Sequence, residues 1–182
     1  VYHDTGSLIP ALSEQQVLDC ADQYKATEFS KIPYDCSEGW FEAPLRMAQK
    51  NGIVGYINYP PNPPPGYRAA KGVCQLAAAK PLQVASWTPL PSVGQGTWIA
   101  PPSEIKDAIC KYGGVVTGIA TAGMREDDFT AIVLGPPNND QGVDHAVQIV
   151  GWNDTDNGGK GVWIIKNSWG TDWGDQGYAR IA

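Results

Sequence analysis

The feature that most constrains this chain of 182 residues is a pair of apolar segments in its last third. Residues 146–152 and 162–166 are rich in Val, Ile and Trp, and they flank a polar, glycine-rich connection, residues 153–161. Two strand-like runs separated by a turn-forming segment are typical of a β-hairpin. The sequence therefore predicts an antiparallel hairpin with a long connection.

This hairpin carries a histidine and an asparagine at matching ends. We take Trp152 to pair with Val162 and count outward along the two strands from that pair. Since side chains alternate between the faces of a strand, His145, Asn167 and Trp169 then share one face. The Asn167 oxygen can accept the N–H of one ring nitrogen, which fixes the tautomer and aims the other nitrogen at a nucleophile. A structural histidine at a strand start is the alternative, and the pairing with Asn167 favours acid/base chemistry.

These residues belong to two longer motifs. The sequence resembles the papain-like cysteine peptidases in Val143-Asp-His-Ala-Val147, around that family's catalytic histidine, and in Lys166-Asn-Ser-Trp-Gly-Thr-Asp-Trp-Gly-Asp-Gln-Gly-Tyr178, around its asparagine. So long a match, with Trp and Gly at fixed places, is a specific signal. By this resemblance His145 is the general base and acid, Asn167 orients it, and Trp169 covers their contact.

The resemblance also implies a fold. We expect an α+β, papain-like architecture of two lobes with the cleft between them. The mainly helical lobe, residues 1–80, would lack the central helix that carries the nucleophile. The β-barrel-like lobe, residues 81–182, would carry the catalytic His145 and Asn167.

A further match concerns substrate binding. Asp35-Cys-Ser-Glu-Gly-Trp40 resembles the family's Cys-Asn-Gly-Gly-Trp/Tyr turn, whose glycines let an extended peptide pair with backbone. Glu38 stands where the first Gly is usual, and its bulky acidic side chain would narrow the cleft or favour a basic substrate residue. A disulfide-anchored turn is the compatible structural interpretation. The expected substrate-binding residues are Ser37, Glu38, Gly39, Trp40, Asp144, Ala146 and Trp169.

The chain has four cysteines and no Cys-x-x-Cys pair. The resemblance implies a disulfide between Cys20 and Cys74, and we expect Cys110 to be a buried free thiol. The family's nucleophile signature, Cys-Gly-Ser/Ala-Cys-Trp/Tyr, does not occur in the sequence. We therefore expect the catalytic cysteine to lie upstream of Val1, next to a cysteine that pairs with Cys36.

The implied function is hydrolysis of peptide bonds in peptide or protein substrates through a Cys-His-Asn arrangement. This chain alone would be inactive because the nucleophile is absent. Two alternatives stay open: a catalytically inactive papain-like protein that binds or stores, and the heavy piece of a two-chain enzyme whose separate chain supplies the cysteine.

Composition narrows the partners and the compartment. Thirteen basic and 19 acidic residues give a net charge of −6, which argues against a nucleic acid or an anionic membrane surface. The two distant histidines and the cysteine spacing argue against a metal site, and no cofactor is expected. Disulfide-forming cysteines favour a secreted, extracellular or lysosome-like location, or a periplasmic one in a bacterium. The tripeptide Asn153-Asp-Thr155 is a possible glycosylation acceptor.

Local signals predict the remaining elements. Ser13-Glu-Gln-Gln16 reads as a capping box that begins a short helix. A second helix is expected over residues 41–50, with Phe41, Leu45 and Ala48 on one side and Gly52 as its stop. A third helix is expected from a Ser103 cap to Gly113, and strands are expected at residues 82–87 and 115–120. Residues 58–66, rich in proline, are expected to form a surface loop.

Overall fold

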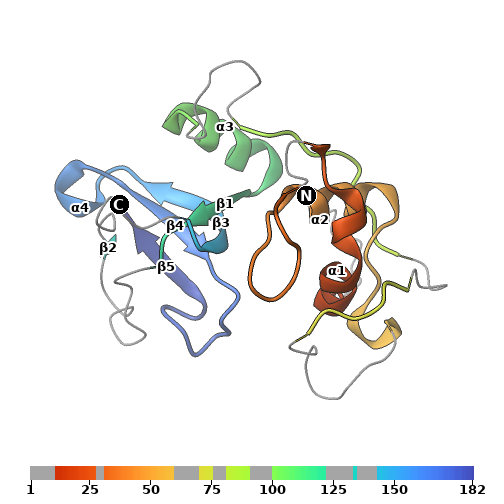
Figure 1. The fold of residues 1–182 in the computed structure, drawn as a ribbon. Helices are drawn as coiled ribbons and strands as arrows, with labels where there is room; N and C mark the ends of the chain where they lie inside the picture. The colour runs from red at the N-terminus through yellow and green to blue at the C-terminus, as the bar shows by residue number, and fades with distance from the viewer. Residues whose placement is uncertain are drawn as a thin grey trace. The chain divides into compact units, whose positions relative to one another are not determined.

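The computed structural model describes residues 11–27, 31–59, 70–75, 81–90, 100–121, 133–134 and 143–182 (Figure 1). The chain divides into two compact units, residues 2–88 and residues 89–182, and each has its own hydrophobic core. Most of the predicted surface loop at residues 58–66 lies outside the described residues. None of the helices in the described ranges has the length and apolar character needed to cross a membrane.

In the described residues of the first unit, the helical segments are α1 (Glu14–Cys20), η1 (Ala21–Tyr24), α2 (Glu42–Lys50) and η3 (Tyr56–Asn58). Ser13 caps α1 as predicted, since its side chain accepts a hydrogen bond from the Gln16 N–H at 3.1 Å. The reciprocal half of the capping box is replaced by a tertiary contact. Gln16 Oε1 accepts from the Val54 N–H at 2.8 Å, and the Ser13 N–H donates to the Val54 carbonyl at 2.9 Å.

The apolar face of α2 differs from the predicted one. Its buried residues include Ala43, Met47 and Ala48, whereas Leu45 is only partly buried. Ala43 and Met47 pack with Cys20. Ala43 and Met47 are four residues apart, so their side chains lie on the same face of the helix.

A disulfide joins Cys20 to Cys74, as the resemblance implies. Beside it, the buried Asp19 carboxylate accepts hydrogen bonds from Gln15 Nε2 at 2.6 Å, the Gly72 N–H at 2.6 Å and the Tyr59 hydroxyl at 3.2 Å. Residues 70–75 are thus held to α1 by the disulfide and by the hydrogen bond from the Gly72 N–H to the buried Asp19 side chain.

The strand predicted at residues 82–87 does not form. Leu82 makes one isolated bridge to Ile53, and the following residues are not in a strand. Their polar groups instead meet the end of α2: the Val84 N–H donates to the Ala48 carbonyl at 3.2 Å, and Gln83 Nε2 lies 3.4 Å from the Lys50 carbonyl. Residues of this segment thus donate hydrogen bonds to carbonyls at the end of α2, which lack partners within the helix.

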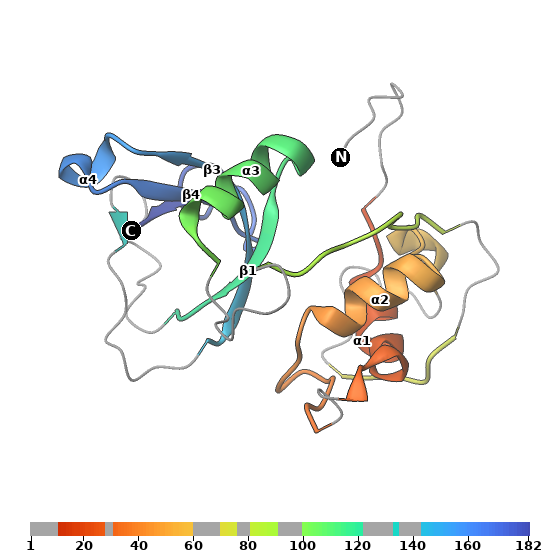
Figure 2. The same ribbon diagram turned by 90° about the horizontal axis from the view of Figure 1, so that it is seen from above.

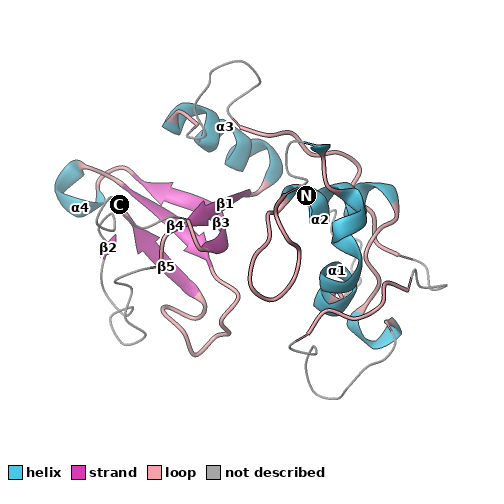
Figure 3. Cartoon of the chain, in the orientation of Figure 1, coloured by secondary structure: helices cyan, strands magenta, loops and turns pink. Residues whose placement is uncertain are grey.

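The second unit is built on a five-stranded sheet (Figure 3). Its order is β1-β3-β4-β5-β2, antiparallel except for the parallel pair of β2 and β5. The strands are β1 (Val115–Ile119), β2 (Val133–Leu134), β3 (His145–Asn153), β4 (Val162–Lys166) and β5 (Tyr178–Ile181), and the helices are α3 (Pro102–Tyr112) and α4 (Asp156–Gly159).

The helix α3 covers one face of this sheet beside β1 and β3 (Figure 2). Ile105 and Ile109 pack there against Val147 and Ile149 of β3, with Ile165 of β4 fully buried beneath. Burial alternates along β3, so its apolar residues at every second position form one wall of the core.

Three details of α3 differ from the sequence prediction. The helix begins at Pro102 after a Pro101 cap, so Ser103 lies inside the first turn. Proline's fixed φ and missing N–H suit the first helical position, and the helix starts there instead of at the serine. Tyr112 and Cys110 are exposed, because only Ile105 and Ile109 face the sheet.

Candidate active site

The hairpin of β3 and β4 sets the geometry of the candidate site. Trp152 pairs with Trp163, so the predicted pairing of Trp152 with Val162 is wrong by one residue. The register shifts between Ile149 and Gly151, where β3 contains one extra residue. On the His145 side of this bulge Gln148 pairs with Lys166, and this register agrees with the one predicted from the sequence.

At that end of the hairpin His145 meets Asn167. His145 Nε2 lies 2.8 Å from Asn167 Oδ1, and the same oxygen accepts a hydrogen bond from the Ser168 N–H at 2.8 Å. Because a backbone N–H can only donate, the Asn167 atom that faces the ring is the oxygen, and Nε2 must donate to it. The remaining ring nitrogen, Nδ1, therefore carries the lone pair in the neutral imidazole and is the atom that can take a proton.

An indole covers this contact. The rings of Trp169 and His145 lie 4.7 Å apart between centroids with an interplanar angle of 34°. Trp173 packs edge-on against Trp169, with 5.5 Å between the ring centroids. Trp173 is buried, with 7% of its surface exposed. Sequence reasoning missed Trp173, although the repeated Trp-Gly dipeptide at residues 169–170 and 173–174 marks a paired arrangement.

The turn after β4 holds Asn167 in place. The Asn167 N–H donates to the Gly177 carbonyl at 2.9 Å, and the Gly177 N–H donates to the Trp173 carbonyl at 2.7 Å. Gly177 has φ +92°, and a Cβ there would lie 3.2 Å from the Gly170 carbonyl oxygen. Only glycine combines this conformation with so close an approach, so the glycines of the motif have a backbone role.

Asp144 anchors the residue before His145. Its carboxylate accepts hydrogen bonds from the Thr121 N–H at 2.7 Å and from the Thr121 hydroxyl at 2.9 Å. These two hydrogen bonds, together with the nearby His145, hold the pKa of Asp144 below its ordinary value. Asp144 thus ties the start of β3 to the end of β1. Thr121 carried no signal in the sequence.

The chain is similar to known proteins along nearly its whole length. The model of the papain family cysteine proteases matches residues 2–182. This chain belongs to the papain family. Digestive cysteine proteinase 1 of Homarus americanus is 31% identical over 180 residues, covering 98% of this chain and 49% of the relative. Cathepsin S of Bos taurus is 31% identical over 180 residues, covering 98% of this chain and 48% of the relative. The chain thus spans about half the length of these curated relatives.

Solved structures agree on the fold. A structure from work on the mite allergens Blo t 1 and Der p 1 superposes with a TM-score of 0.72 at 26% identity, over 98% of this chain and 53% of that one. The bromelain protease from Ananas comosus, in complex with the E64 inhibitor, gives a TM-score of 0.64 at 29% identity, over 98% of this chain and 71% of that one. The fold is therefore α+β and papain-like, with a helical part and a mainly antiparallel sheet.

The other predicted site residues fall into two groups. Ala146 is exposed on β3 next to His145. The predicted substrate-binding turn belongs to the unit of residues 2–88, where the Ser37 N–H and hydroxyl both donate to Asp35 Oδ1, at 2.8 and 2.6 Å. The Asp35 N–H closes the turn on the Glu38 carbonyl at 3.1 Å, and the Trp40 and Phe41 rings lie 4.4 Å apart.

Cys36 and Cys110 are free and exposed. Within the described ranges, no group of three or more His, Cys, Asp or Glu side chains is placed to hold a metal ion.

Proposed function

We propose that this chain supplies the general acid and base of a papain-family peptidase that cleaves peptide bonds. The observation that carries the proposal is the contact of His145 Nε2 with Asn167 Oδ1 at 2.8 Å, on an oxygen already fixed by the Ser168 N–H. This contact leaves Nδ1 as the proton acceptor, which is what a cysteine nucleophile requires.

The proposed reaction is acyl transfer. A cysteine thiol gives its proton to His145 Nδ1, and the resulting thiolate attacks the carbonyl carbon of the scissile peptide. The C–N bond breaks as His145 returns the proton to the leaving amine. Water then attacks the thioester while His145 takes its proton, and the thiol is regenerated as the acid product leaves. Throughout, Asn167 holds the imidazolium in place, and Trp169 shields their hydrogen bond from water.

The nucleophile in this proposal is supplied from outside these 182 residues. Cys20 and Cys74 are bonded to each other, so neither sulfur is available as a thiolate. Cys36 lies in the Asp35–Trp40 turn, and the resemblance assigns it to a structural disulfide with a cysteine near the nucleophile. An upstream segment or a separate chain would provide both the nucleophile and that partner.

We propose that the two compact units, residues 2–88 and residues 89–182, are the helical and the β-barrel-like lobe, for which the sequence predicted a boundary at residue 80. In this proposal the residues that contact the peptide substrate are Ser37, Glu38, Gly39 and Trp40 of the first unit and Asp144, Ala146 and Trp169 of the second. The hydrogen bonds from Ser37 hold the pKa of Asp35 below its ordinary value, and the acidic residue Glu38 lies on the same turn. Two acidic groups on the substrate-binding turn favour substrates with a basic residue at the corresponding position.

We further propose that the protein works in a secreted, extracellular or lysosome-like compartment. The disulfide between Cys20 and Cys74 supports an oxidising environment. The name of the similar Homarus americanus protein, a digestive cysteine proteinase, supports an extracellular location.

The deciding experiment compares three proteins on a fluorogenic peptide substrate: the complete protein, its His145→Ala variant, and the 182-residue chain alone. The complete protein should cleave the peptide in a thiol-dependent manner. His145→Ala should lower kcat by about 100-fold or more, because the acid/base contribution is lost. The chain alone should be inactive. The matched control is His3→Ala, at the other histidine of these 182 residues, which should leave kcat unchanged.

Two results would overturn this proposal. Thiol-dependent cleavage by the 182-residue chain alone would place the nucleophile within it. An inactive complete protein that still binds peptides would instead indicate a papain-like binding protein. A native preparation of two disulfide-linked chains would be consistent with the proposal and would identify the separate chain as the source of the cysteine.

A further inference from the structure

The connection between β3 and β4 lies at the other end of the hairpin from His145. It contains Asn153-Asp-Thr155, the only Asn-x-Ser/Thr tripeptide without proline at the middle position in the 182 residues. Such tripeptides are acceptors of N-linked oligosaccharides, and they are used where the asparagine reaches the surface. The chemistry proposed for the peptidase uses none of these residues.

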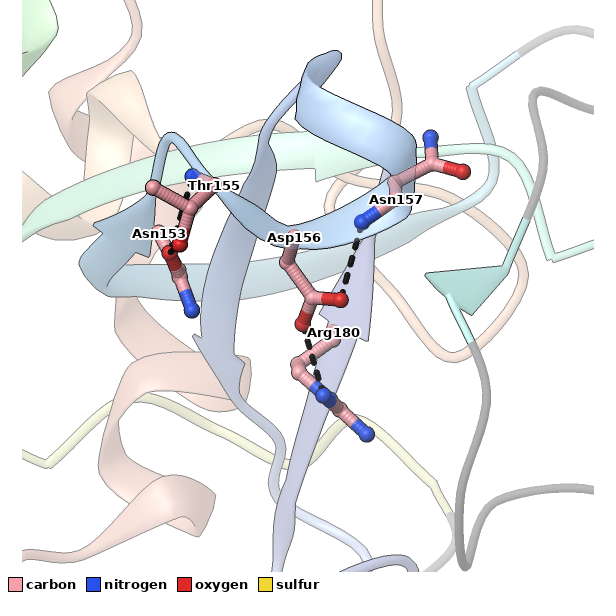
Figure 4. A network of polar contacts seen from close by, with 5 residues as sticks. All are labelled: Asn153, Thr155, Asp156, Asn157 and Arg180. Carbon is pink, nitrogen blue, oxygen red and sulfur yellow. Dashed lines mark hydrogen bonds and ion pairs between the residues drawn. The ribbon is translucent and has the colours of Figure 1, made fainter.

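The tripeptide is held in a defined conformation (Figure 4). Asn153 Oδ1 accepts hydrogen bonds from the Thr155 N–H at 3.0 Å and from the Thr155 hydroxyl at 2.8 Å. Asn153 and Thr155 are both exposed. Figure 4 shows the Asn153 amide nitrogen turned away from Thr155, so the nitrogen that would carry a sugar points out of this turn.

The rest of the connection is fastened to other elements of the same unit. Asp154 forms an ion pair with Lys106 of α3 at 2.6 Å, and Asp156 forms one with Arg180 of β5 at 2.6 Å. The backbone of Asn153 pairs with Val162 in the sheet. These contacts use the carboxylates and the backbone, and the Asn153 amide takes part in none of them. A saccharide on Nδ2 would therefore displace no contact that holds the connection.

We propose that Asn153 is an N-glycosylation site. The donor is a lipid-linked oligosaccharide pyrophosphate of the eukaryotic secretory pathway. A bond forms between Asn153 Nδ2 and the anomeric carbon of the first sugar, the bond from that carbon to the pyrophosphate oxygen breaks, and Nδ2 loses one proton as the lipid pyrophosphate leaves. The Thr155 hydroxyl is the second part of the acceptor.

The position of Asn153 also predicts how its glycosylation affects activity. β3 has nine residues from His145 to Asn153, which at about 3.3 Å per residue separates the two by roughly 26 Å. The oligosaccharide therefore lies far from the His145–Asn167 pair, and its removal should leave peptide cleavage unchanged. In the organism the modification rests on the proposed secretory route, whereas acceptor competence does not depend on peptidase activity.

The test is translation of the complete protein, with a secretory signal sequence, in the presence of endoplasmic-reticulum microsomes. Transfer to Asn153 should give a band of higher mass that peptide N-glycosidase returns to the unmodified position. Mass spectrometry should then find Asp at residue 153. Because transfer occurs on the growing chain, the readout does not require a folded or secreted product.

Variants assign the site. Asn153→Gln and Thr155→Ala should each abolish the sugar at this position, and Thr155→Ser should retain it because the hydroxyl is kept. Asn157→Gln, in the same connection but outside the tripeptide, is the matched control and should leave the modification intact. An unmodified Asn153 in the wild-type protein, or modification that survives in Thr155→Ala, would overturn the proposal.

Discussion

At the scale of single residues, the informative group is Asn167. Its oxygen receives hydrogen bonds from two directions, from the ring of His145 and from the Ser168 N–H. On the proposed mechanism the asparagine orients the imidazole and need not touch the substrate. Its role as a positioning residue can be separated from a binding role by kinetics.

Asn167→Ala in the complete protein should lower kcat by roughly 10- to 100-fold, because a misplaced imidazole transfers protons poorly. KM should change little, since the side chain contacts the histidine. The matched control is Asn157→Ala, in the β3–β4 connection, which should keep full activity. Steady-state kinetics on one peptide substrate measure both constants. A rise in KM with kcat unchanged would contradict the positioning role.

Asp144 gives a prediction about pH. Its hydrogen bonds from Thr121 lower the pKa of the folded state below the ordinary value of 3.8. A carboxyl with a depressed folded pKa stabilises the fold above its unfolded pKa, and this stabilisation is lost as the pH falls through the folded value. Asp144→Asn should therefore lower stability at neutral pH and make stability depend less on pH below about pH 4.

Acid unfolding followed by circular dichroism measures this difference. Asp172→Asn, at an exposed carboxylate of the same unit, is the control and should reproduce the wild-type curve. Parallel acid-unfolding curves for Asp144→Asn and the wild type would show that the Thr121 contact does not contribute.

At the scale of elements, α3 ends in a conformation that few side chains adopt. Gly113 has φ +84° and its N–H donates to the Ile109 carbonyl at 2.8 Å, while nothing lies within 4 Å of a Cβ built there. Gly113→Ala should destabilise the protein by about 1–2 kcal/mol through backbone strain alone. Gly113→Asn should cost less, because asparagine tolerates this region better. Equal thermal midpoints for wild type and Gly113→Ala would contradict this account.

Some of these elements could be predicted from the sequence and others could not. The hairpin followed from its apolar pattern, and the register at Gln148 and Lys166 was right although the pairing of Trp152 with Val162 was wrong. An extra residue in one strand leaves the composition of that strand unchanged, so the bulge had no signature. Residues 82–87 have the composition of a strand, yet their polar groups are used by the end of α2. Such tertiary contacts cannot be read from local propensity.

The candidate site divides in a similar way. The contact of His145 with Asn167 was predicted because both residues lie on one hairpin. Two contacts were not predicted: the packing of Trp173 against Trp169, and the hydrogen bonds from Thr121 to Asp144. These residues lie outside the two hairpin strands. The exposure of Cys110 was also missed: it follows the buried Ile109, and one residue along a helix turns a side chain by about 100°.

At the scale of the whole molecule, the disulfide is the strongest single constraint on the first unit. It joins residues 54 apart in the sequence. Replacing both Cys20 and Cys74 with Ala in the complete protein should lower the free energy of unfolding by about 2–4 kcal/mol, chiefly by releasing the unfolded chain. The control is Cys110→Ser, at an exposed free thiol, which should stay near the wild-type value. Denaturant unfolding measures both, and equal midpoints for the double variant and the wild type would contradict the prediction.

The hairpin has a final consequence, which concerns time. His145 and Asn167 are separated by only 22 residues, so their contact closes a short loop, and isolated hairpins form within about 1–10 μs. On the proposed mechanism the nucleophile arrives from a distant part of the protein, and contacts of large sequence separation form later. The contact between His145 and Asn167 would then form first, and the cysteine would reach it later in folding. A peptidase that folds in this order has no complete active site while its own chain is still unfolded and open to cleavage.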